Sequence, residues 1–406
     1  MEIDIFAVGD EVLYGYTTNS NASFIAQNLL ERGFLPTMHT VVADCPNTVR
    51  EQLVAALKRG RLVIMTGGLG PTVDDLTRTI IAGIFNVPLV KHEVLRKRLE
   101  KISCTTTSIE DQLIQPEGAI LLENAVGTAS GLVLENQTLF PGALLIAMPG
   151  VPTEMKEMFV HQALPLLEAR FTQRQGLIVK TLHFVGLIEN QLDPILRIIK
   201  QRYPHIACGI YPSFSTVSVQ LRGTNARELE EATLPFVEAF NKHIFAAPSG
   251  TLVEAVHLEL LCQNLTLATA ESCTGGALSA AFVANPDASS YLLGGIVAYS
   301  NAVKESLLSV DRLLLETHGA VSEEVTCQMA LSVCQKLGSN LGIAVSGILG
   351  PSGGTPDKPV GTVAASIVHD NRVVLSWTVH LKGTRQHLSK KVVEQILARL
   401  YFYLKN

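Results

Sequence analysis

The chain has 406 residues, of which 47% are hydrophobic and 17% are charged, and its formal net charge at pH 7 is −5. This composition is typical of a folded, water-soluble protein, and the acidic balance argues against a protein that binds nucleic acid through its phosphates. Because one domain usually holds about 100–200 residues, the length predicts two to four domains.

Residues 1–170 alternate short apolar runs with amphipathic stretches. Strands that alternate with helices indicate a three-layer α/β domain, in which helices cover both faces of a mainly parallel sheet. The pattern predicts strands at 3–9, 35–43 and 61–71 and helices at 21–34 and 47–60.

Residues 171–250 show a different pattern, which predicts a small α+β domain of strand, helix, strand pair and helix. The stretch AAPSGT (246–251) indicates a linker, because Pro and Gly interrupt both periodicities. Residues 251–406 return to strand–helix alternation. The predicted fold class is therefore α/β, with two three-layer domains and mainly parallel sheets joined by a small α+β domain.

Signals for export, membrane insertion and cross-linking are weak. The opening MEIDIFAVGDE reads as a strand rather than a signal peptide, because no basic region precedes a long apolar run. The longest apolar stretches, such as 143–148, fall far short of the ~20 residues of a membrane helix. Seven cysteines without C-x-x-C spacing argue against a zinc site or a disulfide framework. We expect a cytoplasmic protein without membrane or nucleic-acid partners.

Three polar or glycine-bearing loops follow predicted strands in the last domain: ESCTGG (271–276), YSNAVK (299–304) and SGILGPSGGT (346–355). Loops at the carboxyl ends of parallel strands meet at one edge of a sheet, where ligands usually bind. Glycines let backbone N–H groups approach a ligand, and a helix N-terminus favours an anion. The sequence therefore predicts a binding site at this edge.

The first of these loops offers three candidate nucleophiles, Ser272, Cys273 and Thr274. No histidine lies in the three loops, so a Cys–His pair is disfavoured, whereas a desolvated Lys304 is a chemically adequate base for a serine. Tyr299 could orient or relay the proton. The same residues also fit ordinary roles, since a lysine on a helix is usually solvated and a serine before a helix is often its cap.

The first domain has a corresponding set of loops at 8–21, 65–77 and 148–155. Carboxylates beside a glycine loop suit a divalent cation that holds phosphates and activates water. In the alternative interpretation, the acidic side chains cap helices. The candidate metal ligands are Asp10, Glu11, Asp74, Asp75 and Glu154, and the candidate phosphate-binding residues are Gly67, Gly68, Gly70 and Thr72.

The blocks TAESCTGG, GGIVAYSNAVK, HGAVSEEV and SGILGPSGGTPDKPVGTV closely resemble the C-terminal domain of the CinA (competence-damage-inducible) family. That domain is similar to bacterial nicotinamide mononucleotide deamidases, which hydrolyse the carboxamide of this nucleotide without a cofactor. The resemblance implies Ser272 as nucleophile, with Tyr299 and Lys304 assisting. It also implies a nucleotide and oxyanion site formed by Thr274, Gly275, Gly276, Ser346, Gly347, Gly353, Gly354, Thr355 and Arg385.

One block departs from the family pattern G-D-R-x-x-V-R. It reads GTRQHLS here, which keeps Gly383 and Arg385 but places Ser389 at the second arginine. If Arg385 is the arginine that binds the anion, the clamp on a phosphate or carboxylate is retained. If the family uses the second arginine, part of the clamp is missing.

The loops of the first domain resemble the MogA and MoaB molybdopterin-binding fold in the form found at the N-terminus of CinA proteins. This resemblance implies metal-dependent hydrolysis of ADP-ribose to AMP and ribose 5-phosphate. Two blocks differ from the family. Its D-T-N reads Asn19-Ser20-Asn21, which loses a carboxylate, and its M-P-x-x-N-x-x-Q reads TTTSIEDQ (105–112), which keeps only Gln112.

Together the two sets of loops predict a bifunctional hydrolase of pyridine-nucleotide metabolism. Its partners are expected to be small nucleotides, nicotinamide mononucleotide and ADP-ribose, with a divalent metal ion in the N-terminal domain only. The family resemblance also implies a homodimer. The alternative is a nucleotide- or pterin-binding scaffold in which one or both sites are degraded, as the altered 105–112 block and Ser389 suggest.

Overall fold

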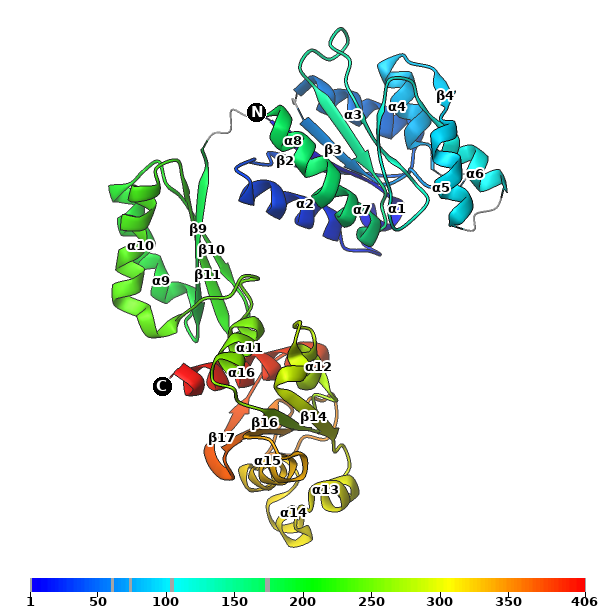
Figure 1. Cartoon of the computed structure of the whole chain (residues 1–406). Helices are drawn as coiled ribbons and strands as arrows, with labels where there is room; N and C mark the ends of the chain where they lie inside the picture. Colours follow the sequence, from blue (N-terminus) through cyan, green and yellow to red (C-terminus); the bar gives the residue numbers. More distant parts are fainter. Residues whose placement is uncertain (1, 60–61, 73–74, 103–105, 172–175, 406) are drawn as a thin grey trace. The chain divides into compact units, whose positions relative to one another are not determined.

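The computed structural model describes residues 2–59, 62–72, 75–102, 106–171 and 176–405 (Figure 1). The chain divides into two compact units, Met1–Val179 and Lys180–Asn406. No helix within the described ranges is long and apolar enough to cross a membrane.

The first unit is built on a six-stranded sheet. Its order is β2 (Met38–Val42), β1 (Ile3–Val8), β3 (Leu62–Thr66), β8 (Leu144–Met148), β7 (Gly131–Leu134) and β6 (Ile120–Leu122). The first four strands pair in parallel, and the last two pair antiparallel. Every residue of β1, β3 and β8 is buried, as is typical of central strands covered on both faces.

Helices pack on both faces of this sheet and form two separate cores. One core contains residues of α3 (Pro46–Arg59) and α4 (Thr77–Phe85), and the other contains residues of α2 (Ser20–Glu31), α7 (Pro152–Met158) and α8 (Leu164–Arg170). The remaining elements are α1 (Asp10–Leu13), α5 (Arg96–Lys101), α6 (Thr106–Leu113) and the pair β4 (Leu89–Lys91) and β5 (Ile114–Pro116).

The second unit begins with a four-stranded sheet in the order β10 (Ala207–Pro212), β11 (Thr216–Gly223), β9 (Ile178–Val185) and β12 (Ile244–Phe245). Two helices accompany it, α9 (Glu189–Arg202) and α10 (Ala226–Phe240). Strand, helix, strand pair and helix follow one another as the sequence pattern predicts for an α+β segment.

A five-stranded sheet follows in the same unit, in the order β14 (Leu292–Val297), β13 (Leu267–Glu271), β15 (Leu341–Gly347), β16 (Thr362–His369) and β17 (Arg372–His380). The first three strands are parallel, and β16 and β17 are antiparallel additions. Asp370 and Asn371 both have positive φ, as a two-residue hairpin turn requires. The mixed α/β fold class is thus confirmed, and this turn accounts for the antiparallel pairing of β16 with β17.

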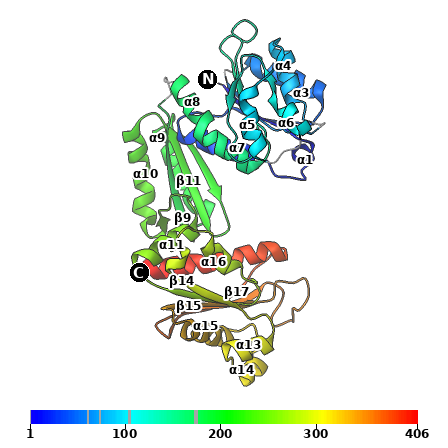
Figure 2. The same cartoon turned by 45° about the vertical axis from the view of Figure 1, so that its right-hand side comes forward.

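The five-stranded sheet is also a middle layer, with helices on both of its faces (Figure 2). One core contains residues of α11 (Leu252–Cys262), α12 (Ala277–Val283) and α16 (Arg385–Lys405), and the other contains residues of α14 (Arg312–His318), α15 (Glu323–Leu337) and α13 (Asn301–Leu308). Because β13, β14 and β15 run in parallel, the loops that follow them emerge at one edge, as expected.

Candidate active sites

A serine and a lysine side chain meet at the carboxyl ends of β13 and β14. Ser272 directly follows β13, and Lys304 lies in the first turn of α13. The Nζ atom of Lys304 is 3.1 Å from Ser272 Oγ. Lys304 is only 1% exposed and Ser272 is 7% exposed, so this lysine is not the solvated side chain that a surface helix would usually carry.

The backbone holds the Lys304 ammonium in place. Its Nζ also donates to the carbonyl oxygen of Ala298, at 2.7 Å, and to that of Tyr299, at 3.2 Å. Burial lowers the pKa of Lys304, because removal from water disfavours the charged form. A lysine with a lowered pKa can accept the proton of a neighbouring serine hydroxyl at neutral pH.

Cys273, the second candidate nucleophile, sits in a different environment. It is buried, and burial is the main reason that the pKa of its thiol rises to about 12. The thiolate is the nucleophilic form of cysteine, so this thiol is poorly suited to attack. The geometry favours Ser272 without any appeal to family resemblance.

Glu271 organises the turn that follows Ser272. Its buried carboxylate accepts hydrogen bonds from the backbone N–H groups of Gly276, at 3.0 Å, of Leu278, at 3.0 Å, and of Ser279, at 2.8 Å, and from the Ser279 hydroxyl. A carboxylate in this position satisfies the first donors of α12. The sequence placed Glu271 in the loop 271–276 but gave it no role, because nothing in the sequence shows which donors its carboxylate faces.

The predicted binding residues of this turn are therefore placed differently from expectation. The N–H of Gly276 already donates to Glu271, and the N–H of Gly275 donates to the Ser272 carbonyl at 3.2 Å. Thr274 Oγ1 is buried and has no hydrogen-bond partner among the described residues. The Thr274 hydroxyl is therefore a polar group in this turn that no described residue contacts by a hydrogen bond.

A cavity of about 250 Å³ opens beside the serine–lysine pair. It collects residues from all three loops and from the start of α16. Lining residues that the sequence predicted are Ser272, Tyr299, Lys304, Ser346, Gly347, Gly353 and Arg385, whereas Thr274, Gly275, Gly276, Gly354 and Thr355 are not part of the lining.

Arg385 is fixed at the edge of this cavity. Its Nη1 donates to the carbonyl oxygen of Gly350 at 2.8 Å, and its Nη2 donates to the hydroxyl of Tyr299 at 3.0 Å. The Tyr299 residue is 62% exposed, so its ring lies near the mouth, while its carbonyl holds Lys304. Arg385 is thus placed where a guanidinium could contact an anionic ligand.

The first unit has a cavity of about 390 Å³ at the corresponding edge of its sheet. Predicted residues in its lining are Glu11, Gly68, Gly70, Thr72, Asp75 and Glu154. Asp10 and Gly67 adjoin the lining without belonging to it, and Asp74 lies outside the described residues.

The glycine loop of this cavity depends on the absence of side chains. Gly67 has a φ of 104°, and a Cβ there would lie 2.2 Å from the carbonyl oxygen of Val8. Gln112 Nε2 donates to the Leu69 carbonyl at 3.1 Å, and Arg78 Nη2 donates to the Gly70 carbonyl at 3.2 Å. Gln112, the residue retained from the altered family block, therefore supports the loop.

Asp44 is an acidic residue of this cavity that sequence reasoning missed. Although Asp44 is largely exposed, its pKa is raised, first by partial burial and then by repulsion from Glu11, Asp10 and Asp75, which outweigh the hydrogen bond it accepts from the Asp10 N–H at 2.9 Å. Crowded negative charge of this kind attracts a cation. The available signal was its position directly after the strand predicted at 35–43.

Other carboxylates of the cavity have partners within the protein. Asp75 Oδ2 accepts from the N–H of Thr72 at 2.9 Å and from its hydroxyl, and Glu154 accepts from Asn124 Nδ2 at 2.7 Å. Among the described residues, no group of three or more His, Cys, Asp or Glu is arranged to hold a metal ion. A cation such as Mg²⁺ does not need such a group when it is held by one or two carboxylates together with water and substrate phosphates.

Two family models match the chain, one over most of the first unit and the other over the C-terminal part of the second unit. Residues 249–404 match the family described as the CinA C-terminal domain, and residues 4–169 match the family described as a probable molybdopterin binding domain. A CinA-like protein of Prochlorococcus marinus is 38% identical over 380 residues, which cover 91% of this chain and 89% of that protein. The chain belongs to the CinA family.

Other CinA relatives extend along most of the chain. A CinA-like protein of Trichodesmium erythraeum is 34% identical over 400 residues, covering 95% of this chain and 92% of the relative. Among solved structures, a CinA superfamily protein of Klebsiella pneumoniae is 31% identical and covers 38% of this chain and 96% of its own, with a TM-score of 0.37. The resemblance inferred from the sequence motifs is confirmed.

Proposed function

We propose that the C-terminal domain hydrolyses the carboxamide of nicotinamide mononucleotide, with Ser272 as nucleophile and Lys304 as its base. The observation that supports this most strongly is the 3.1 Å contact between the buried Lys304 Nζ and Ser272 Oγ beside a cavity. An amide is a poor electrophile, so its hydrolysis needs an activated nucleophile and a proton donor for ammonia. One buried amine can serve both steps.

In the proposed reaction, Lys304 accepts the Ser272 proton as Oγ bonds to the carboxamide carbon. The resulting tetrahedral intermediate expels ammonia, which takes the proton back from Lys304 and leaves an ester on Ser272. Water, deprotonated by Lys304, then cleaves this ester to the carboxylic acid and restores the hydroxyl. In this proposal Arg385, which Gly350 and Tyr299 hold at the edge of the cavity, contacts the phosphate of the nucleotide.

Ammonia release tests this function directly. The wild-type protein is expected to release ammonia from nicotinamide mononucleotide, and Ser272→Ala is expected to lose this activity. Equal rates in the two proteins would remove Ser272 as the nucleophile. No release by the wild type, together with tight nucleotide binding, would favour the alternative of a binding scaffold.

We also propose that the N-terminal domain hydrolyses ADP-ribose to AMP and ribose 5-phosphate with a divalent cation. The raised pKa of Asp44 among Glu11, Asp10 and Asp75 supports a cation site beside the glycine loop. A bound divalent cation supplies a Lewis acid for the pyrophosphate and lowers the pKa of its water. The chain itself contributes backbone groups at Gly68 and Gly70 toward the phosphates.

Two observations favour a weaker site here. Asn19, which replaces the family aspartate, caps α2 by accepting from the Ala22 N–H at 3.0 Å. Asp75 and Glu154 already have hydrogen-bond partners. The test is AMP formation from ADP-ribose with and without Mg²⁺, comparing the wild type with Asp75→Ala. AMP formation that is equal with and without metal would contradict the proposal.

A further inference from the structure

Two sequence blocks of the C-terminal domain have no part in the proposed chemistry, HGAVSEEV (318–325) and the end of SGILGPSGGTPDKPVGTV (346–363). Both blocks contribute residues that line the Ser272 cavity. Ala320 and Val321 form one side, and the loop after β15 contributes Gly350, Ser352 and Gly353. What holds these two loops together determines the shape of the cavity.

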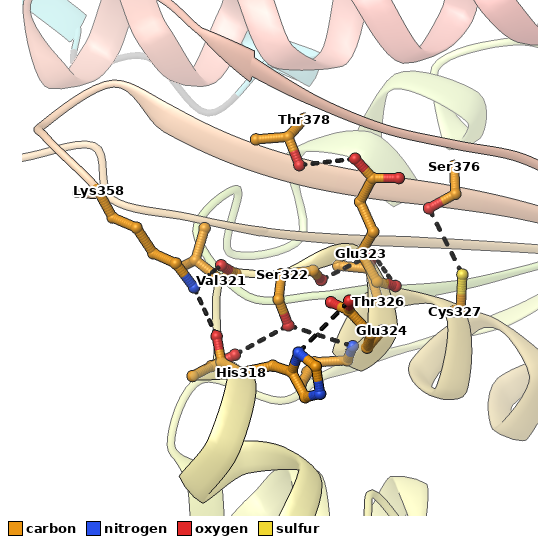
Figure 3. Close-up of polar contacts among 12 residues, drawn as sticks. His318, Val321, Ser322, Glu323, Glu324, Thr326, Cys327, Lys358, Ser376 and Thr378 are labelled. Carbon is orange, nitrogen blue, oxygen red and sulfur yellow. Dashed lines mark hydrogen bonds and ion pairs between the residues drawn. The ribbon is translucent and has the colours of Figure 1, made fainter.

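Lys358 joins the two loops (Figure 3). From the loop after β15, its Nζ donates to the carbonyl oxygen of His318 at 2.5 Å and to that of Val321 at 2.6 Å. These carbonyls flank Ala320, and His318 is the last residue of α14, where a cation is favoured by the helix dipole. Hydrogen bonds from a charged donor are about twice as strong as neutral ones.

Each loop is also ordered by local contacts. On one side, the Ser322 hydroxyl donates to the Gly319 carbonyl at 3.0 Å and caps α15. On the other side, Thr355 and Lys358 form a closed turn, in which the Thr355 N–H donates to the Lys358 carbonyl at 2.9 Å and the Lys358 N–H donates to Thr355 Oγ1 at 3.0 Å. Lys358 therefore links two preformed loops.

We propose that Lys358 is a positioning residue that fixes the two loop walls of the Ser272 cavity relative to one another and thereby sets its affinity for the nucleotide. The inference about affinity rests on the proposed function. The Lys358 side chain bonds to the 318–321 backbone, whereas Lys304 bonds to Ser272, Ala298 and Tyr299. Loss of Lys358 should accordingly change binding and leave the nucleophile intact.

Steady-state kinetics measure this separation of binding from chemistry. For Lys358→Met we expect KM for nicotinamide mononucleotide to rise on the order of tenfold while kcat changes by less than about twofold. This pattern is typical of losing an interaction that stabilises the bound substrate and the transition state equally. Lys358→Arg keeps donors for both carbonyls and should recover most of the affinity. The matched control is Lys336→Met, at an exposed position near the end of α15.

Hydrogen exchange tests the contact itself and does not depend on turnover. In Lys358→Met, amide exchange is expected to accelerate in both 318–322 and 350–361, with an unchanged rate in β13 and an unchanged unfolding temperature. Lys336→Met should leave both loops protected. Unchanged exchange in the loops, or a fall in kcat that equals the fall in kcat/KM, would overturn the proposal. If the wild type releases no ammonia, the proposed function fails, and the exchange result still decides whether Lys358 braces the loops.

Discussion

The two cavities of this chain occupy corresponding edges of two α/β sheets but differ in how their reactive groups are set. In the C-terminal domain, a single buried amine contacts one buried hydroxyl. In the N-terminal domain, several carboxylates surround a larger cavity, and Glu11 and Asp44 are exposed. Burial lowers the pKa of Lys304, whereas at Asp44 partial burial and repulsion from neighbouring carboxylates together raise the pKa.

The comparison separates a site whose proposed reactive groups all come from the protein from a site whose proposed chemistry also needs a bound cation. The proposed nucleophile, Ser272, and its proposed base, Lys304, are already in contact, and two backbone carbonyls hold the amine. In the proposal for the acidic cavity, the ligand set is completed by metal, water and phosphate. Substitutions that affect one cavity and spare the other can therefore test the comparison.

The largest effect is expected from Lys304→Met. Removal of the base should lower deamidation on the order of 10³-fold, within the usual range for general acid–base catalysis. The unfolding temperature should change little, because loss of the desolvated amine is offset by the loss of the donor to the Ala298 and Tyr299 carbonyls. Ammonia release and AMP formation would be measured side by side, and AMP formation should be unchanged. Near-normal deamidation would show that Lys304 is structural.

A smaller loss is expected when an N-terminal carboxylate is neutralised. Glu11→Gln should reduce Mg²⁺-dependent AMP formation from ADP-ribose by roughly 10–100-fold, as for a lost metal-supporting group. Glu31→Gln, at the exposed end of α2, is the matched control. The comparison between the cavities breaks down if Glu11→Gln keeps full activity or if it also impairs ammonia release.

The two activities should also respond to pH with different midpoints. Deamidation requires neutral Lys304, so kcat/KM should rise with pH through a midpoint below the usual lysine value of 10.5. At subsaturating Mg²⁺, AMP formation should fall as pH falls below the raised pKa of Asp44, because protonation of this carboxyl weakens cation binding. Rate profiles from pH 4 to 10, recorded on both substrates, would check both directions. A deamidation rate that falls as pH rises would contradict Lys304 as the base.

The smallest effect is predicted for Cys273→Ala. Because the buried thiol stays protonated, we expect deamidation within about twofold of the wild type. The loss of a buried sulfur should cost about 1 kcal/mol of unfolding free energy, measurable by denaturant titration. A loss of activity as large as that of Ser272→Ala would instead assign the attack to Cys273.

The strand-end rule brought the three C-terminal loops together without coordinates, because parallel strands end at one edge of a sheet. It left three candidate nucleophiles, and the choice of Ser272 with Lys304 came from the family resemblance. The same rule gathered Glu11, Gly68, Asp75 and Glu154 at the other cavity. The fold class followed from strand–helix alternation, which is the most direct signal in the sequence.

What the sequence could not supply is how polar groups are shared among partners. Whether the N–H of Gly276 faces a ligand or Glu271 depends on the side-chain geometry of a buried carboxylate. The contact of Lys358 with His318 spans 40 residues of sequence and has no periodicity to reveal it. Asp44 was within reach of the strand-end rule, but its charge environment depends on two other segments, which carry Asp10, Glu11 and Asp75.

The central claim is that Ser272, activated by Lys304, attacks the carboxamide. It is tested most directly by rapid quenching of the wild-type protein during turnover of nicotinamide mononucleotide, followed by mass spectrometry of its peptides. We predict an ester adduct of the acyl nucleotide on the peptide that contains Ser272, lost in Ser272→Ala and retained in Cys273→Ala. An adduct located on Cys273, or on any peptide in Ser272→Ala, would contradict the claim.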